Sequence, residues 1–154
     1  MSIQKPELDD ADRKIVNILK ENADITSNAL GEIVNLSASA TNERIRKLKS
    51  EGIIKKIIAQ IDASALGMQL GAFIFVLVCG KKRNENFLEN TVSHQNILEC
   101  HHVTGDYSYL LKVRLKNTKA LENFMTDFIK AQPGVIRTTT QIIMHSTKDS
   151  GTAI

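Results

Sequence analysis

The 154-residue chain is 42% hydrophobic and 24% charged, which excludes a disordered chain and allows one domain or two small ones. Its net charge of +3 is too small to indicate a nucleic-acid partner by itself. The N-terminus is polar and acidic, and the longest apolar run, residues 70–79, is about half of the ~20 residues that a membrane helix needs. We therefore expect a cytoplasmic protein without a signal peptide or a membrane partner.

Charge is unevenly distributed along the first sixty residues. Residues 1–32 carry four Lys or Arg against seven Asp or Glu, whereas residues 33–61 carry six against two. The positive charge therefore falls on the second of these segments, where a DNA-binding module needs phosphate contacts.

Residues 8–51 have the pattern of three helices. The first begins after an early Asp near Leu8 and has apolar residues at helical spacing. The second is capped by Thr26 or Ser27, and its small Gly31 allows close helix crossing. We expect the apolar stripes of these two helices to be buried: Ile15, Ile18, Leu19, Leu30, Ile33 and Val34.

A turn at residues 35–37 and a Ser37 cap then start a third helix, which runs to about residue 51 and ends at Gly52. Residues 27–46 thus resemble a helix-turn-helix, whose second helix enters the major groove of DNA. We expect a buried stripe of Ala38, Thr41, Ile45 and Leu48, and an outward face on which Asn42 reads adenine and Arg46 reads guanine. The predicted DNA-binding residues are Ser37, Ser39, Asn42, Arg44, Arg46, Lys47 and Lys55.

The segment Ile53–Ile58 is β-branched and apolar apart from two lysines, and we interpret it as a short strand, or wing, beside the helix-turn-helix. An alternative is an ordinary three-helix bundle whose third helix has a solvated basic face. The helix spacing, the capped turn, the glycine stop and the basic strand together favour the DNA-binding interpretation.

The second half of the chain has the pattern of four strands and two helices. The expected order is a buried strand (69–79), a basic turn (80–83), a helix (84–94), a strand (97–103), a tight turn (104–106), a strand (107–115), a helix capped by Thr118 and stopped by Pro133–Gly134, and a last strand (135–145). This βαββαβ order predicts a ferredoxin-like sheet with both helices on one face. We expect dimerisation through the other, uncovered face.

Small polar residues cluster at two places in this half: Gly105, Asp106, Tyr107 and Ser108 at the tight turn, and Thr138–Gln141 on the last strand. Backbone N–H groups and hydroxyls suit a carboxylate, and Asp106 suits an ammonium group, so the cluster is compatible with a zwitterion. A β-turn beside a threonine-rich edge strand explains the same residues equally well. The predicted effector-binding residues are Gly105, Asp106, Tyr107, Ser108, Thr138, Thr140 and Gln141.

The sequence has no pattern of a metal site or a catalytic site. Cys79 and Cys100 belong to no CxxC pair and are interpreted as buried, reduced thiols. His101 and His102 are adjacent in a predicted strand and would point to opposite faces. No paired carboxylates or nucleophile–base pair converge. We therefore expect no cofactor and no enzymatic activity.

Several motifs, in this order, resemble the Lrp/AsnC, or feast/famine, family of prokaryotic transcription regulators: LDDADRKIVNIL, LGEIVNLSASATNERIRKLKSEGII, IDASALGMQLGAF, LECHHVTGDYSYLLKV and PGVIRTTTQIIM. The resemblance implies a winged helix-turn-helix, a ferredoxin-like ligand-binding domain, dimers paired through the C-terminal sheets, and frequent octamers. It also implies amino-acid effectors bound between C-terminal domains, with Gly105, Asp106, Tyr107 and Thr140 matching the family motifs. Ser108 stands where leucine-responsive members carry Asp, and Ala38 and Ala40 stand where prolines are common.

These observations predict an α+β protein with a winged helix-turn-helix domain (1–62), a linker (63–68), a ligand-binding and oligomerisation domain (69–146) and a tail (147–154). The predicted function is sequence-specific regulation of transcription, modulated by a small free amino acid. Its expected partners are double-stranded DNA, the amino acid and further copies of the chain. The alternative is an architectural protein that wraps DNA with little sequence preference.

Overall fold

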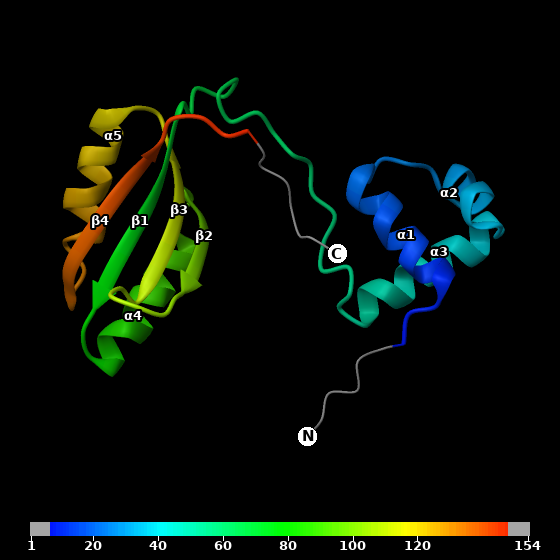
Figure 1. The fold of residues 1–154 in the computed structure, drawn as a ribbon, viewed down its shortest axis with the longest axis horizontal. Coiled ribbons are helices and arrows are strands. Elements are labelled where there is room, and N and C mark those ends of the chain that lie inside the picture. The colour runs from blue at the N-terminus through cyan, green and yellow to red at the C-terminus, as the bar shows by residue number, and fades with distance from the viewer. Residues whose placement is uncertain (1–6, 148–154) are drawn as a thin grey trace. The chain divides into compact units, whose positions relative to one another are not determined.

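A computed structural model describes residues 7–147, which form two compact units, residues 7–60 and 61–147 (Figure 1). The first unit contains α1 (Asp10–Glu21), α2 (Ser27–Val34) and α3 (Ala38–Ser50). The second contains a four-stranded sheet and its helices. All but the first residue of the predicted tail lies outside the described residues.

Each helix of the N-terminal unit begins at a side-chain cap. Asp9, Thr26 and Ser37 accept hydrogen bonds from backbone N–H groups three residues further along, at 2.8, 3.2 and 3.2 Å. These bonds satisfy donors that the first helical turn leaves without a partner. The caps therefore set where the helices start, and the predicted starts of α2 and α3 are correct.

The three helices enclose a small core made of Ile15, Leu30, Val34 and Leu48, with the methyl-bearing Thr41 fully buried beside it. Ile18, Leu19 and Ile45 pack against this core from its edge. The prediction for Ile33 is wrong, because 55% of this residue is exposed. The eight-residue helix α2 turns only part of its surface toward α1 and α3, and Ile33 lies outside that part.

The predicted strand at Ile53–Ile58 is absent from the described chain, which has irregular backbone there. Gly52 adopts a φ of +73° after α3, and the N–H of Ile53 donates to the Leu48 carbonyl at 3.0 Å, which closes the helix. A strand needs a neighbouring strand for its backbone donors and acceptors, and none of the strands described in residues 7–147 pairs with this segment. High β-propensity alone is therefore not enough to make this segment a strand.

The C-terminal unit has the predicted βαββαβ order and a fully antiparallel sheet in the order β2-β3-β1-β4. The helices cover one face of this sheet. Phe87, Leu121 and Ile129 from the helices pack in one core with Ile74 and Leu111 from the strands. The elements are β1 (Leu70–Val78), α4 (Lys81–Ser93), β2 (Ile97–His102), β3 (Tyr109–Leu115), α5 (Thr118–Asn123), the π-helix η1 (Phe124–Ile129) and β4 (Val135–Ile143).

Three local predictions in this unit need correction. The predicted basic turn at residues 80–83 is mostly helical, because Gly80 takes a φ of +96° and α4 begins at Lys81. Three cations in a first turn oppose the helix dipole, so the sequence pattern favoured a later start. Asn117, not Thr118, caps α5, its Oδ1 accepting from the Ala120 N–H at 2.9 Å. The strand β3 begins at Tyr109 instead of residue 107.

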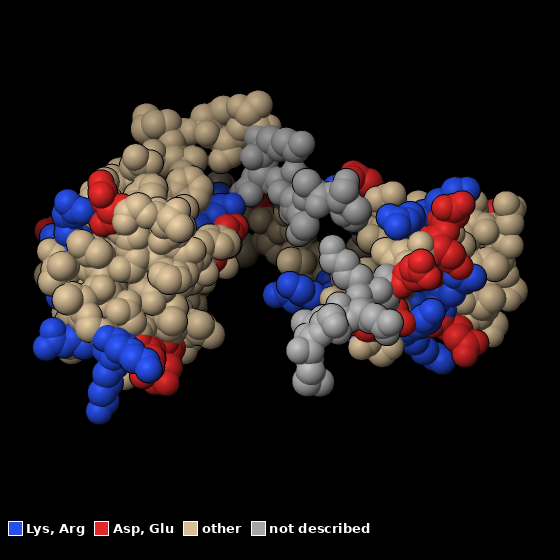
Figure 2. Space-filling model, turned by 60° about the horizontal axis from the view of Figure 1, so that its bottom comes forward, with Lys and Arg blue, Asp and Glu red and all other residues tan. Residues whose placement is uncertain are grey.

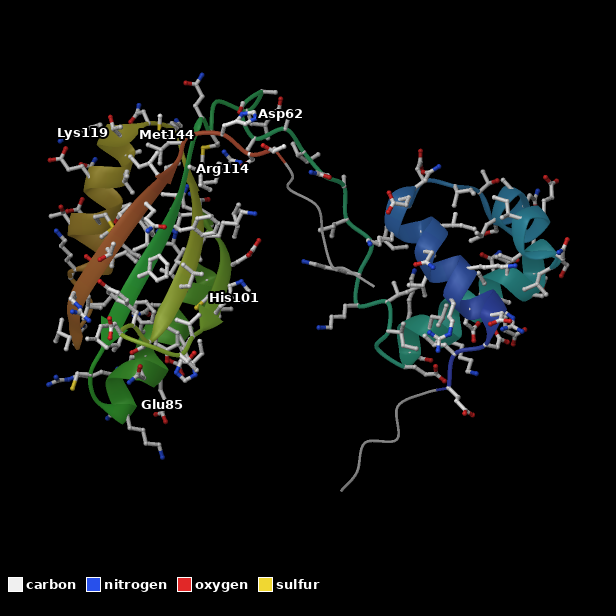
Figure 3. All side chains as sticks on the ribbon, viewed as in Figure 1. Asp62, Glu85, His101, Arg114, Lys119 and Met144 are labelled. Atoms are coloured by element: carbon white, nitrogen blue, oxygen red, sulfur yellow. The ribbon has the colours of Figure 1, made fainter. Side chains whose placement is uncertain are left out.

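The sheet face opposite the helices carries the aromatic residues Phe73 and Phe75 and the aliphatic Leu77, all half-buried. Their cross-strand partners include Leu110 and Lys112 on β3. Arg114 and His101, labelled in Figure 3, belong to the same face by register. We call this surface the open face; in the described chain no element of the C-terminal core packs on it.

His94 follows α4, and its ring packs 4.2 Å from the Phe128 centroid and 5.0 Å from that of Phe124. Burial lowers the pKa of this imidazole below its ordinary value of 6.5, because the charged form loses hydration. Its Nδ1 also accepts a hydrogen bond from the Asn96 N–H at 3.2 Å, which protonation of that nitrogen would abolish.

We expect the stability of the C-terminal unit to fall modestly as the pH drops below about 6.5. The unfolded chain binds a proton at His94 more readily than the folded chain does, so acid favours unfolding until the folded residue is also protonated. Urea unfolding between pH 8 and pH 5 measures this, with His94→Phe preserving the aromatic packing and His101→Gln as an exposed control. An unchanged pH dependence in His94→Phe would contradict the assignment.

Candidate nucleic-acid interface and effector site

The outward face of α3 is polar and basic. Ser39, Asn42, Arg46, Lys47 and Lys49 are all exposed, as predicted from the helical spacing. On the surface that Figure 2 shows, basic and acidic side chains gather over the N-terminal unit, at right, while most of the C-terminal unit is uncharged. Ser37 caps this helix, and Lys55 is exposed beyond its end.

Asn42 is held by Ser27, a residue predicted only as a possible helix cap. The Ser27 hydroxyl donates to Asn42 Oδ1 at 2.6 Å, which links the start of α2 to the outward face of α3. The amide nitrogen of Asn42 stays available as a donor, and its oxygen has a second lone pair. Ser27 lies 15 positions away, so only the helix packing could identify it.

Arg44 lies against α1. Its Nη1 is 2.6 Å from Asp9 Oδ2 and 2.8 Å from Asp12 Oδ1, and Asp12 is only 4% exposed. The Asp12 N–H and the Arg44 guanidinium together lower the pKa of Asp9, and the two carboxylates raise the pKa of Arg44. This predicted DNA-binding residue therefore joins α3 to the start of α1, while Lys47 makes a looser 3.8 Å pair with Glu51.

The tight turn between β2 and β3 places Gly105 at a φ of +109° and leaves Asp106 exposed. Ser108 follows as a backbone anchor. Its N–H donates to the Val76 carbonyl at 3.0 Å, and its hydroxyl accepts from the Val78 N–H at 3.3 Å. The Ser108 hydroxyl thus helps to fix the turn against β1.

Tyr107 reaches the open face beside β4. Its phenol oxygen lies 2.5 Å from Thr139 Oγ1, and its ring is 5.6 Å from Phe75. The Arg137 guanidinium carbon lies 4.8 Å from the centroid of this ring, and Arg137 Nη2 donates to the Asp106 carbonyl at 3.0 Å. Thr139 and Arg137 were not among the predicted site residues, and alternation along β4 was the signal for them.

The predicted effector-binding residues of β4 fall on both faces of the sheet. Thr138 and Thr140 pair with Val76 and Ile74 and so point to the helical side, where the Thr140 hydroxyl lies 3.7 Å from Met125 Sδ. Gln141 pairs with Phe73 and points to the open face. Successive strand residues point to opposite faces, so one site within a single chain cannot use all three side chains.

No group of three or more His, Cys, Asp or Glu residues within 7–147 is placed to hold a metal ion. The prediction of two buried thiols is wrong for Cys79, which is exposed, and holds only in part for Cys100, which is half-buried. Burial raises the pKa of the Cys100 thiol. Glu99 accepts from His101 at 3.1 Å and pairs with Lys112 at 3.3 Å, which together lower its pKa.

The family follows from comparison with known domains. Residues 8–55 match the family model described as winged helix-turn-helix DNA-binding, and residues 71–153 match the Lrp/AsnC ligand binding domain. The chain belongs to the Lrp/AsnC family. The predicted fold class, a winged helix-turn-helix followed by a ferredoxin-like domain, is confirmed, although within the described residues the segment 53–58 forms no strand.

Relatives of this Lrp/AsnC protein match it over nearly its full length. The HTH-type transcriptional regulator FL11 of Pyrococcus horikoshii is 39% identical, with 93% of each chain covered. The transcriptional regulator AzlB of Bacillus subtilis is 31% identical, covering 92% of this chain and 91% of that protein.

Solved structures of related regulators have the same fold as this chain. The Neisseria meningitidis transcriptional regulator NMB0573, in complex with L-Met, has a TM-score of 0.89 at 28% identity, covering 94% of both chains. Escherichia coli AsnC has a TM-score of 0.86 at 25% identity, covering 95% of this chain and 98% of that one.

The protein is therefore a transcription regulator of the Lrp/AsnC family with a DNA-binding and a ligand-binding domain. These relatives and domains confirm the prediction that it is not an enzyme. Among residues 7–147, no helix is long and apolar enough to cross a membrane.

Proposed function

We propose that this protein is a sequence-specific, cytoplasmic DNA-binding regulator whose assembly or DNA affinity changes when it binds a small amino acid. The observation that carries the DNA-reading role is the outward face of α3, where Asn42 is braced by Ser27 at 2.6 Å beside the exposed Arg46. A braced amide loses less conformational entropy when it meets a base edge. Ser37, Ser39, Lys47 and Lys55 supply phosphate contacts around it.

Arg44 has a supporting role in this proposal. Its guanidinium is held by Asp9 and Asp12, so it fixes the angle between α1 and α3 and contributes to DNA binding mainly through that geometry. Asn42 and Arg46 are the two side chains that we assign to base edges.

For the effector, we propose a zwitterion bound near Gly105, Asp106 and Tyr107, with Thr140 and its neighbours Thr138 and Gln141 completing the site between subunits. The two faces on which these residues lie favour a site to which more than one chain contributes. An L-Met complex of a related regulator supports the ligand class. A ligand that binds two assemblies with different affinity shifts the balance between them.

A thermal shift of the full chain against each of the twenty amino acids at millimolar concentration tests this proposal. A ligand present at 100 times its Kd stabilises the folded state by about 2.7 kcal/mol, which raises the melting temperature measurably. We expect one or a few amino acids to do so, and Asp106→Ala and Thr140→Ala to reduce the effect. No shift with any amino acid would contradict the effector class, and equal affinity for unrelated DNA sequences would instead favour an architectural role.

The open face is the proposed dimer surface, because the aromatic residues Phe73 and Phe75 at its centre are only half-buried within one chain. Phe73→Asp introduces a charge there without entering the core under the helices, so we expect a dimer to become a monomer. Sedimentation velocity measures the change. Val92→Asp, at a residue of α4 that is 83% exposed, is the control and leaves the dimer intact. A dimeric Phe73→Asp variant would place the interface elsewhere.

A further inference from the structure

A cavity of about 480 Å³ opens on the C-terminal unit where β3 passes into α5. This volume lies within the range of small-molecule sites. Lys119, labelled in Figure 3, marks the adjoining end of α5. None of the predicted effector-binding residues lines the cavity. Its lining includes Leu115, Lys116, Ala120, Phe124, Asp127 and Phe128.

The floor of the cavity is apolar and aromatic. Leu115 and Phe124 are buried, and Phe128 stacks on Phe124 with their ring centroids 5.3 Å apart. His94 extends this surface, with its ring 4.2 Å from that of Phe128. Because burial lowers its pKa, the imidazole adds a neutral ring to the floor at neutral pH. Such a floor favours an apolar group.

The rim carries groups of opposite charge. Lys116 follows β3, Asp127 lies on η1, and both side chains are exposed beside the apolar floor. A lysine ammonium suits a carboxylate, and an aspartate suits an ammonium group. With one charge of each sign, the rim matches a net-neutral zwitterion better than a simple anion or cation.

Part of the lining comes from the π-helix η1, a form of helix that is rare and often occurs at functional sites. The Lys130 N–H donates to the Met125 carbonyl, five residues back, at 2.9 Å. This wide turn supplies Phe124, Asp127 and Phe128, so the unusual backbone coincides with the cavity.

We propose that this cavity binds an α-amino acid with an apolar side chain, separately from the site at Gly105–Ser108. The inference rests on the proposed function for the class of ligand and differs from it in the place of binding. Met68 also lines the cavity, and its N–H donates to the Ala63 carbonyl at 2.9 Å. A ligand that contacts Met68 therefore restrains the end of the segment that joins the two units.

Methionine methyl groups make this testable in the full chain. Met68 lines the cavity, whereas Met125 Sδ contacts Thr140 of the effector site proposed above. The protein is labelled with [methyl-¹³C]methionine and titrated with unlabelled L-leucine, L-methionine and L-phenylalanine, with L-glutamate as a charged comparison. We expect a saturable shift of the Met68 resonance with at least one apolar amino acid and none with L-glutamate.

Variants then test the location. Ala120→Leu adds three carbon atoms that occupy part of the cavity, and their clash with a bound ligand is expected to abolish the Met68 shift. Lys116→Gln and Asp127→Asn remove one charge each from exposed positions and are expected to weaken binding by roughly two- to fivefold, the range of exposed ion pairs. Lys119→Gln is the matched control, because this residue is 72% exposed on α5 and does not line the cavity.

The outcomes separate the two proposals. A Met68 shift that is lost in Ala120→Leu and weakened by the two rim variants supports the cavity. A shift confined to Met125 and lost in Asp106→Ala overturns the cavity and leaves the proposed effector site standing. No shift of the Met68 methyl with any of these probes overturns the cavity, and the thermal-shift screen of all twenty amino acids then decides the proposed effector site. A Met68 shift that survives unchanged in Ala120→Leu, Lys116→Gln and Asp127→Asn also overturns the cavity.

Discussion

Gly31→Ala is expected to destabilise the N-terminal unit by about 1–3 kcal/mol, the usual cost of overpacking a tight site. In most helices this substitution is favourable by roughly 1 kcal/mol, because alanine has the higher helix propensity. Here a Cβ atom would lie 2.6 Å from the Leu36 carbonyl oxygen and 3.1 Å from Thr41 Oγ1. The Leu36 oxygen belongs to the backbone of the turn between α2 and α3, so it cannot rotate away.

Hydrogen exchange of the amides in α2 and α3 measures this effect, because it reports on the N-terminal unit alone. Gly71→Ala is the matched control. Its Cβ would meet the ends of the flexible Arg114 and Ile143 side chains, at 3.1 and 3.3 Å, and these can move. Equal protection in Gly31→Ala and the parent protein would contradict the close packing of α2 on the turn.

Arg46→Ala is expected to weaken binding to a selected DNA duplex by about 1–3 kcal/mol, which is roughly 5- to 150-fold in Kd, if Arg46 reads a base. Arg46 is exposed on α3, whereas Arg44 is already paired with two carboxylates. Titrations at fixed salt, repeated on duplexes with single substitutions, measure both affinity and base preference.

Arg13→Ala is the control for Arg46→Ala, since it removes an exposed arginine from α1 and keeps the change in net charge the same. A uniform loss of affinity on all duplexes, with the slope of log Kd against log salt concentration reduced by about 1, would reassign Arg46 to a phosphate contact. An unchanged Kd would exclude a role for Arg46 in DNA binding.

Local chemistry made much of the fold predictable. The capping roles of Thr26 and Ser37 depend on residues three positions away, and the apolar spacing of each helix is equally local. The order of strands and helices followed from alternating patterns and turn residues. Ile53–Ile58 was the exception, because a strand depends on a partner that its own composition does not reveal.

The site residues were less predictable, since their partners lie far along the chain. In the sequence, Arg44 is one of several cations on a basic helix. Only the fold shows that its Nη1 lies 2.6 Å from Oδ2 of Asp9, which is 35 positions away. In the sequence, residues 138–140 form one polar cluster, whereas the sheet register places their side chains on two opposite faces. Ser27 and Arg137 were missed for the same reason: their contacts depend on packing between elements.

The irregular segment after α3 also matters before the protein has folded. Residues 53–61 contain five isoleucines, of which Ile57, Ile58 and Ile61 are 46, 67 and 62% exposed. Exposed apolar, β-branched stretches are typical of the segments that form cross-β aggregates. Lys55 and Lys56 interrupt this stretch at its centre, and like charges repel when identical segments stack. We therefore expect the two lysines to act as gatekeepers that reduce self-association of the newly made chain.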